Sequence, residues 1–107
     1  MITLKKEKEF SKVYQKGQKK HTKYVIIIFL NNKLNEKRFG FVASKKTGNA
    51  VKRNRIKRLF REVVRLNYNK FKENYDYIII GKAVLKDNID SLKYDTMEKD
   101  ILKGIIK

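Results

Sequence analysis

The excess positive charge of this chain is confined to its first 70 residues, and this uneven distribution limits what the chain can fold into. Residues 1–70 hold 21 of the 28 Lys and Arg but only 4 of the 11 Asp and Glu, whereas residues 71–107 hold seven of each kind. The net charge of +17 belongs to a chain of 107 residues, a length that suits one domain with one modest core. A charge divided in this way indicates a binding face for a polyanion. Nucleic acid is the first candidate, and an anionic membrane surface is the second.

The residue types needed for most protein-borne chemistry are scarce. The chain has no Cys, which excludes disulfides, Cys zinc sites and thiol nucleophiles, and its single His, His21, stands among Lys residues. The carboxylates of the basic region are few, and the glycines are too scattered for a phosphate-binding loop. We therefore expect no catalytic residue, no metal site and no small-molecule substrate. The lack of Cys, of a signal-like segment and of an apolar run longer than Tyr24–Leu30 predicts a cytoplasmic protein that does not enter a membrane.

The apolar pattern predicts three helices and three strands in a single domain, residues 1–107. Helices are expected at about residues 5–16, 51–68 and 92–103, and Gly17 is expected to end the first one in a left-handed conformation. Strands are expected at 24–30, 38–44 and 76–81, with the first two paired as a hairpin. This order predicts an α/β (α+β) two-layer sandwich with a small mixed sheet. The general rule would make its strand–helix–strand crossover right-handed.

The predicted helix at 51–68 has two contrasting faces. At about 100° per residue, one face gathers the apolar side chains of Ile56, Leu59, Phe60, Val63 and Leu66. The opposite face gathers the polar and basic side chains of Asn54, Lys57, Arg58, Arg61 and Arg65. Five of the six Arg of the chain lie between residues 53 and 65, although Lys outnumbers Arg by 22 to 6. Because a guanidinium group grips phosphate with two parallel bonds and stacks on bases, this choice of Arg indicates contacts with nucleic acid.

The loop that opens this helix extends the basic face. Lys45, Lys46 and Lys52 lie in or just after the loop, where unpaired backbone N–H groups and the helix dipole also attract anions. A membrane-surface helix would show a similar pattern, but the core of so small a domain needs the apolar face. Duplex DNA read in a major groove and RNA recognised by its shape and backbone both fit these residue types.

Aromatic side chains indicate a second binding region. Phe10 and Tyr14 share one face of the first helix, whereas Phe29, Phe39 and Phe41 lie on the predicted strands. Core packing is the better explanation for Phe39 and Phe41. Phe10 and Tyr14 can line a groove where the helix crosses the edge of the sheet, and aromatic rings in a basic groove hold single-stranded nucleic acid.

The segment from Ser44 to Glu62 resembles the signature of the protein subunit of bacterial ribonuclease P. It reads SKKTGNAVKRNRIKRLFRE, with Arg53-Asn54-Arg55 at its centre. The resemblance extends over nearly the whole chain, because the first-helix pattern, the segment Arg38-Phe39-Gly40 and the strand at 76–80 also match.

This resemblance implies a ribozyme in which a large RNA subunit, using Mg²⁺, removes the 5′ leader of precursor tRNA. It also implies a ribosomal-protein-like α/β sandwich with a left-handed crossover. The residues that it implies for binding the RNA subunit are Ser44, Lys45, Lys46, Lys52, Arg53, Asn54, Arg55, Lys57, Arg58, Arg61 and Arg65. The single-stranded leader would lie in a cleft between the first helix and the sheet, lined by Phe10, Tyr14, Val25, Ile27 and Phe29.

Two other functions fit the residues considered alone. A ribosomal or general structured-RNA-binding protein would show the same charge pattern but would not distinguish precursor from mature tRNA. A DNA-binding protein would prefer duplex DNA.

We expect RNA binding by this chain to weaken steeply as salt is added. If about five to seven phosphates are neutralised, the logarithm of the binding constant falls against the logarithm of the salt concentration with a slope of about −4 to −6. Titration of a bacterial ribonuclease P RNA at a series of KCl concentrations measures this slope. A slope near zero would contradict a polyanion-binding face.

Overall fold

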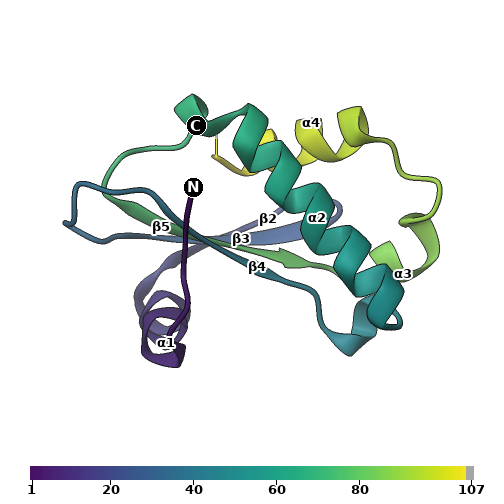
Figure 1. The fold of residues 1–107 in the computed structure, drawn as a ribbon, viewed down its shortest axis with the longest axis horizontal. Helices are drawn as coiled ribbons and strands as arrows, with labels where there is room; N and C mark the ends of the chain where they lie inside the picture. Colours follow the sequence, from purple (N-terminus) through teal and green to yellow (C-terminus); the bar gives the residue numbers. More distant parts are fainter. Residues whose placement is uncertain (106–107) are drawn as a thin grey trace.

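Five strands form one mixed sheet in the computed structural model, which describes residues 1–105 (Figure 1). The strands lie in the order β1-β4-β5-β3-β2, with the bounds β1 Ile2–Thr3, β2 Gln18–His21, β3 Val25–Asn31, β4 Arg38–Val42 and β5 Tyr75–Gly81. β3 runs antiparallel to β5 and β2, whereas β4 runs parallel to β5 and β1. The two strands with the longest apolar runs, β3 and β5, are thus neighbours inside the sheet, where such runs are covered on both faces.

Helices cover the two faces of the sheet unequally. α2 (Ala50–Leu66) and α4 (Tyr94–Ile105) lie over one face, as the predicted sandwich requires, and α1 (Glu7–Lys16) covers part of the other face (Figure 1). Short turns of helix follow β4, α2 and β5, with the bounds Lys45–Thr47, Tyr68–Lys70 and α3 Leu85–Asn88. The face that carries α1 is therefore the more open one.

The alternation of strand side chains creates two separate cores. One core lies beneath α2 and α4 and contains Ile27, Phe39 and Ile79, packed with Phe60 of α2. The other core lies beneath α1, where Ile28 and Ile78 pack with Val13 and Leu4. Because successive side chains of a strand point to opposite faces, each apolar run supplies both cores at once.

The predicted hairpin between the strands at 24–30 and 38–44 is wrong. β5 lies between β3 and β4, and each of them pairs with β5 instead of with the other. The segment at 32–37 does not turn tightly, because it has to cross the end of β5, and Asn32 is bonded there through its backbone N–H to the Asn74 carbonyl at 2.6 Å. The hairpin partner of β3 is β2, which the sequence did not indicate because Gln18–His21 is polar and exposed throughout.

Two local expectations also need correction. Gly17 follows α1 with φ −75° and ψ 158°, which is extended and not left-handed. A Cβ atom there would lie 2.5 Å from the Val13 carbonyl oxygen, so glycine is required by the close approach of the backbone. On α2, Val64 joins the buried face, whereas Leu66 remains 56% exposed and Leu59 is half-buried. The buried face of α2 therefore includes Val64 and excludes Leu66, so it is rotated about the helix axis relative to the predicted apolar face.

An ion-pair network holds the start of α1 against the sheet. The Arg38 guanidinium donates to both carboxylate oxygens of Asp76 at 2.8 Å and to Glu9 of α1 at 2.7 Å. Glu9 also accepts hydrogen bonds from the backbone N–H groups of Lys6 and Lys5 at 2.9 and 3.0 Å. These two backbone bonds, with a contribution from the charge of Arg38, lower the pKa of Glu9. The network fixes the position of α1 with groups from β4, β5 and the helix itself.

We expect the substitution Glu9→Gln to reduce stability at neutral pH and to have little effect in acid. The pKa of Glu9 is lower in the folded state than its ordinary value of 4.5, so its ionised form stabilises the fold above that value. This contribution is lost as the pH falls through the folded-state pKa. Urea midpoints measured from pH 7 to pH 3 test this, with Glu7→Gln as the control because Glu7 shares the first turn of α1 but not the Arg38 network. Equal loss of stability in the two variants at pH 7 would contradict a specific role for Glu9.

Candidate nucleic-acid interface

The segment between β4 and α2 is shaped by capping side chains. The Ser44 hydroxyl accepts a hydrogen bond from the Lys46 N–H at 3.3 Å, and the Asn49 side chain accepts one from the Lys52 N–H at 3.0 Å. Gly48 between them has φ 122°, a conformation that side-chain-bearing residues rarely adopt. Asn49 is the N-cap of α2. The turn places the exposed Lys45 and Lys46 at the start of this helix.

The eleven residues predicted to bind the RNA subunit all lie on the turn at residues 44–47 and on α2, and we call them the α2 surface. None of them is buried, and eight are exposed, the half-buried ones being Lys52, Arg53 and Lys57. Lys52 is half-buried because its ammonium group donates to the Lys86 carbonyl at 2.8 Å. The surface spans the turn at residues 44–47 and the length of α2.

The arginines of α2 occupy two flanks of the helix. On the flank toward β4, the Arg61 guanidinium carbon lies 5.4 Å from the centre of the Phe41 ring, a cation–π contact that leaves Arg61 exposed. On the flank toward α3, Arg55 is paired with Asp90 and Arg65 with Glu62 of the same helix. The hydrogen bond from Arg65 lowers the pKa of Glu62. Exposed ion pairs of this kind are weak, so phosphate groups can replace the carboxylates.

The predicted leader cleft is partly misplaced. Phe10 packs against the sheet on the α1 side, since a Cβ atom at Gly40 would lie 2.6 Å from its ring, and Tyr14 is 38% exposed. Val25 and Ile27 instead lie fully buried on the opposite face, and Phe29 belongs to that face too. The error has a simple cause, because a shift of one residue along a strand reverses the face to which a side chain points.

The side chains that face α1 from the strands were missed by sequence reasoning. Val42, Ile80, Ile26 and His21 are direct neighbours across β4, β5, β3 and β2, and we call them the sheet row. The three apolar members are half-buried and pack against the core beneath α1, and His21 is exposed. Only the pairing register brings these residues together, so no local signal in the sequence could have identified the row.

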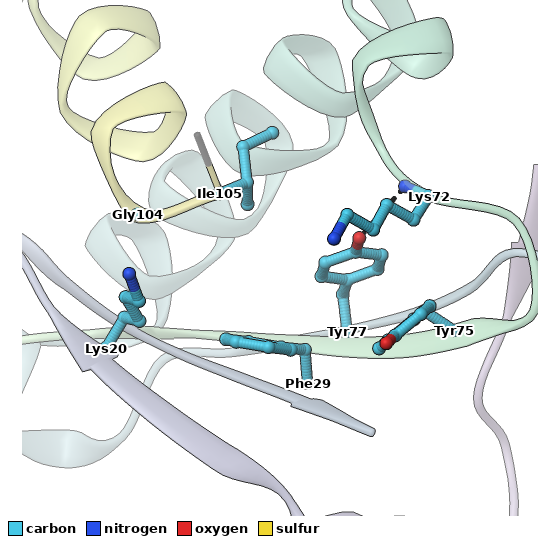
Figure 2. A pocket seen from close by; sticks show the side chains of 7 residues that line it. All are labelled: Lys20, Phe29, Lys72, Tyr75, Tyr77, Gly104 and Ile105. Atoms are coloured by element: carbon cyan, nitrogen blue, oxygen red, sulfur yellow. Dashed lines mark hydrogen bonds between the residues drawn. The ribbon is translucent and has the colours of Figure 1, made fainter. Parts of the chain in front are cut away.

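Phe29 contributes to a small cavity on the α4 side of the sheet, shown in Figure 2. The cavity encloses about 10 Å³, and its walls are formed by Lys20, Phe29, Lys72, Tyr75, Tyr77, Gly104 and Ile105. The Tyr77 hydroxyl accepts a hydrogen bond from the Lys72 N–H at 2.9 Å. A space of this size holds no more than about one water molecule, so the cavity is too small for a nucleotide.

The acidic residues of the described region are dispersed. Across residues 1–105, no group of three or more His, Asp or Glu side chains is arranged to hold a metal ion. Several carboxylates already have protein partners, such as Asp100, which accepts hydrogen bonds from the Thr22 hydroxyl at 2.6 Å and the Tyr24 N–H at 2.9 Å. Within the same residues, no helix has the length and apolar character needed to cross a membrane.

A mixed α/β sandwich with an exposed Arg-rich helix on one face and an open apolar row on the other defines a nucleic-acid-binding protein. Known proteins identify its family. The family model described as Ribonuclease P matches residues 2–107. The ribonuclease P protein component of Fusobacterium nucleatum is 54% identical over 101 residues, which cover 94% of this chain and 91% of that protein. The corresponding protein of Natranaerobius thermophilus is 40% identical over 96% of this chain and 86% of that protein.

The chain therefore belongs to the ribonuclease P protein family, whose members are the protein component of the endonuclease that processes the 5′ end of tRNA. The fold agrees with this family. Ribonuclease P protein from Thermotoga maritima superposes with a TM-score of 0.89 at 24% identity, covering 100% of this chain and 99% of that one. The Staphylococcus aureus protein gives a TM-score of 0.85 at 28% identity, covering 98% and 93%.

These matches confirm the predicted fold class and favour neither the ribosomal nor the DNA-binding alternative. The crossover formed by β4, α2 and β5 joins two adjacent parallel strands. Since superposition does not interchange hands, this crossover has the hand of the Thermotoga maritima protein. The left hand that the family resemblance implies for this crossover stays a prediction.

Proposed function

We propose that this chain binds ribonuclease P RNA through the turn at residues 44–47 and α2, and holds the 5′ leader of precursor tRNA on the opposite face of the sheet. The RNA subunit carries out the hydrolysis, and the protein increases the affinity for the substrate. The observation that carries the proposal is the α2 surface of eleven basic and polar residues in a chain of this family. The cytoplasm is the compartment in which we place this assembly.

The two flanks of α2 suit a folded RNA. Arg61 presents charge toward the β4 side, whereas Arg55 and Arg58 present it toward the segment that follows α3. A cylinder with guanidinium groups on both flanks can contact phosphates of two strands or of two neighbouring helices. Recognition of this kind depends on the shape and backbone of the RNA rather than on its sequence.

The sheet row suits a single strand. Its apolar members lie beside α1, which carries the half-exposed Tyr14, and its outer member His21 belongs to the basic strand β2. Unpaired bases can contact the apolar row and the tyrosine ring while Lys residues of β2 contact the phosphates. Because mature tRNA lacks a leader, this face would increase affinity for the precursor alone.

The Mg²⁺ ions of the reaction belong to the RNA subunit in this proposal. The carboxylates of the described residues do not fit a metal site, because Asp76 and Glu9 are paired with Arg38 and Asp100 is engaged with Thr22 and backbone N–H groups. We therefore assign no step of the hydrolysis to a metal ion held by this chain.

We expect this protein to restore cleavage of precursor tRNA by Fusobacterium nucleatum ribonuclease P RNA at a Mg²⁺ concentration too low for the RNA alone. The triple variant Arg53→Ala/Arg55→Ala/Arg58→Ala should bind that RNA about 100-fold more weakly, since each charged contact contributes roughly 1 kcal/mol or more. The control Lys93→Ala/Lys99→Ala/Lys103→Ala removes the same charge from exposed positions of the C-terminal region and should restore cleavage. Equal loss in both triple variants would show that net charge, and not the α2 surface, carries binding.

The leader-binding face has its own test. Tyr14→Ala should raise the KM of the holoenzyme for precursor tRNA by about 10-fold, because base stacking on an aromatic ring contributes about 1–3 kcal/mol. Inhibition by mature tRNA and affinity for the RNA subunit should not change. Leu34→Ala, which truncates a side chain that is 49% exposed in the loop before β4, serves as the control. A parallel loss of affinity for mature tRNA would place Tyr14 outside the leader site.

A further inference from the structure

An open groove separates α2 from the segment that joins α3 to α4. It measures about 500 Å³, and its lining consists of Arg55, Arg58, Leu59, Glu62, Leu66, Ile89, Leu92 and Tyr94. The walls are formed by apolar side chains and the ring of Tyr94, whereas the charged residues Arg55, Arg58 and Glu62 of α2 form the rim. A space of this volume lies within the range of sites that bind small molecules or parts of larger ones.

The apolar walls of the groove are partly exposed to solvent. Leu66 lies in the last turn of α2 with 56% of its surface exposed, and Leu59 and Leu92 are half-buried. Leu66 and Leu59 are the positions at which the predicted apolar face of α2 differs from the observed buried one. Adjacent exposed apolar side chains with a polar rim are typical of a surface that contacts another molecule.

Tyr94 is held in place on the α4 side of the groove. Its hydroxyl donates a hydrogen bond to Glu98 at 2.8 Å and accepts one from the Asn67 side chain at 3.4 Å. The ring therefore has a fixed position before any ligand binds. A side chain that is already ordered loses little freedom on binding.

The charge around the groove determines what it can bind. Arg55 and Arg58 lie on its rim, and Arg65 follows within two turns on the same flank. A second copy of this chain would bring the same arginines and a net charge of +17 against them, which opposes self-association. A nucleotide instead offers phosphate to the guanidinium groups and the flat face of a base to Leu66, Leu92 and Tyr94.

We propose that this groove binds an unpaired base of the RNA that α2 contacts, between Leu66 and Leu59 of the helix and Leu92 and Tyr94 of the facing segment. This inference rests on the proposed function, in which α2 binds RNA. The groove would add a site for a base next to the phosphate contacts of α2. The α2 surface then distinguishes RNA with an unpaired base at this point from a regular duplex, which phosphate contacts alone do not.

The test compares two RNAs and uses the full-length chain. The probes are transcribed Fusobacterium nucleatum ribonuclease P RNA and a blunt RNA duplex without unpaired bases. Leu66→Ala/Leu92→Ala should bind the ribonuclease P RNA about 10-fold more weakly and the duplex with unchanged affinity. The salt dependence should keep its slope, because no phosphate contact is removed. The control Leu34→Ala/Val84→Ala, which truncates exposed apolar side chains outside the groove, should bind both RNAs like the native protein.

A fluorescent reporter gives a second readout that does not depend on affinity. The chain contains no Trp, so Leu66→Trp introduces a single indole at the groove. We expect its emission to be quenched by ribonuclease P RNA and not by the duplex, whereas Leu34→Trp should respond to neither RNA. Unchanged urea midpoints of the variants show that they are folded.

Three outcomes would overturn the inference. The first is native affinity of Leu66→Ala/Leu92→Ala for both RNAs, and the second is an equal loss for both. The third is a native dimer by light scattering that becomes a monomer in this variant, which would assign the groove to a second copy. The proposed function fails separately, when the native chain does not restore cleavage at low Mg²⁺. Restored cleavage together with native binding by the groove variant would reject the groove alone.

Discussion

The position of β5 between β3 and β4 is the constraint on which the rest of the structure depends. β5 pairs along its length with both neighbours, antiparallel to one and parallel to the other. Its side chains alternate between the two cores, with Ile79 beneath α2 and α4 and Ile78 beneath α1. Near the start of β5, Asp76 accepts two hydrogen bonds from Arg38. Arg38 in turn donates to Glu9 of α1. The strand that is central to the sheet thus also determines where the two proposed nucleic-acid-binding faces lie.

The parts of the fold that local periodicity specifies could be predicted from the sequence, and the parts that depend on pairing could not. The helix predicted at 51–68 corresponds to α2 because its apolar side chains recur every three or four residues, and Arg58, Arg61 and Arg65, predicted on its solvent face, are exposed. The sheet order was not predicted, because nothing in the apolar runs of β3 and β4 indicates that β5, much further along the chain, lies between them. β2 was missed because an exposed edge strand has no apolar alternation to display.

The same distinction explains the outcome for the candidate site. The residues of the α2 surface follow one another in the sequence, so the motif alone predicts that they lie together, and their role in binding stays a prediction. The leader cleft requires the facing direction of each strand residue, which the uniform run from Val25 to Leu30 leaves undetermined, since every residue in it is apolar. The sequence therefore predicts Val25 and Ile27 on the α1 side of the sheet, whereas in the structure Ile26 faces this side. The two aromatic residues on α1 avoided this ambiguity because helical periodicity, unlike a run of isoleucines, distinguishes one face from another.

The two proposed RNA-binding faces lie on opposite sides of the sheet, yet a short length of chain connects them. Val42 of the sheet row ends β4, and only Ala43 separates it from Ser44, where the α2 surface begins. The C-terminal end of β5 lies near the same place, because Ile80 pairs with Val42. The side chain of Lys82, which follows β5, donates a hydrogen bond to the Thr22 carbonyl in the turn between β2 and β3. An RNA subunit bound along α2 would therefore reach the edge of the sheet at which the row opens. A leader on the row and an RNA subunit on the helix would meet at this edge, so in this proposal the sheet itself brings the substrate and the catalytic RNA together.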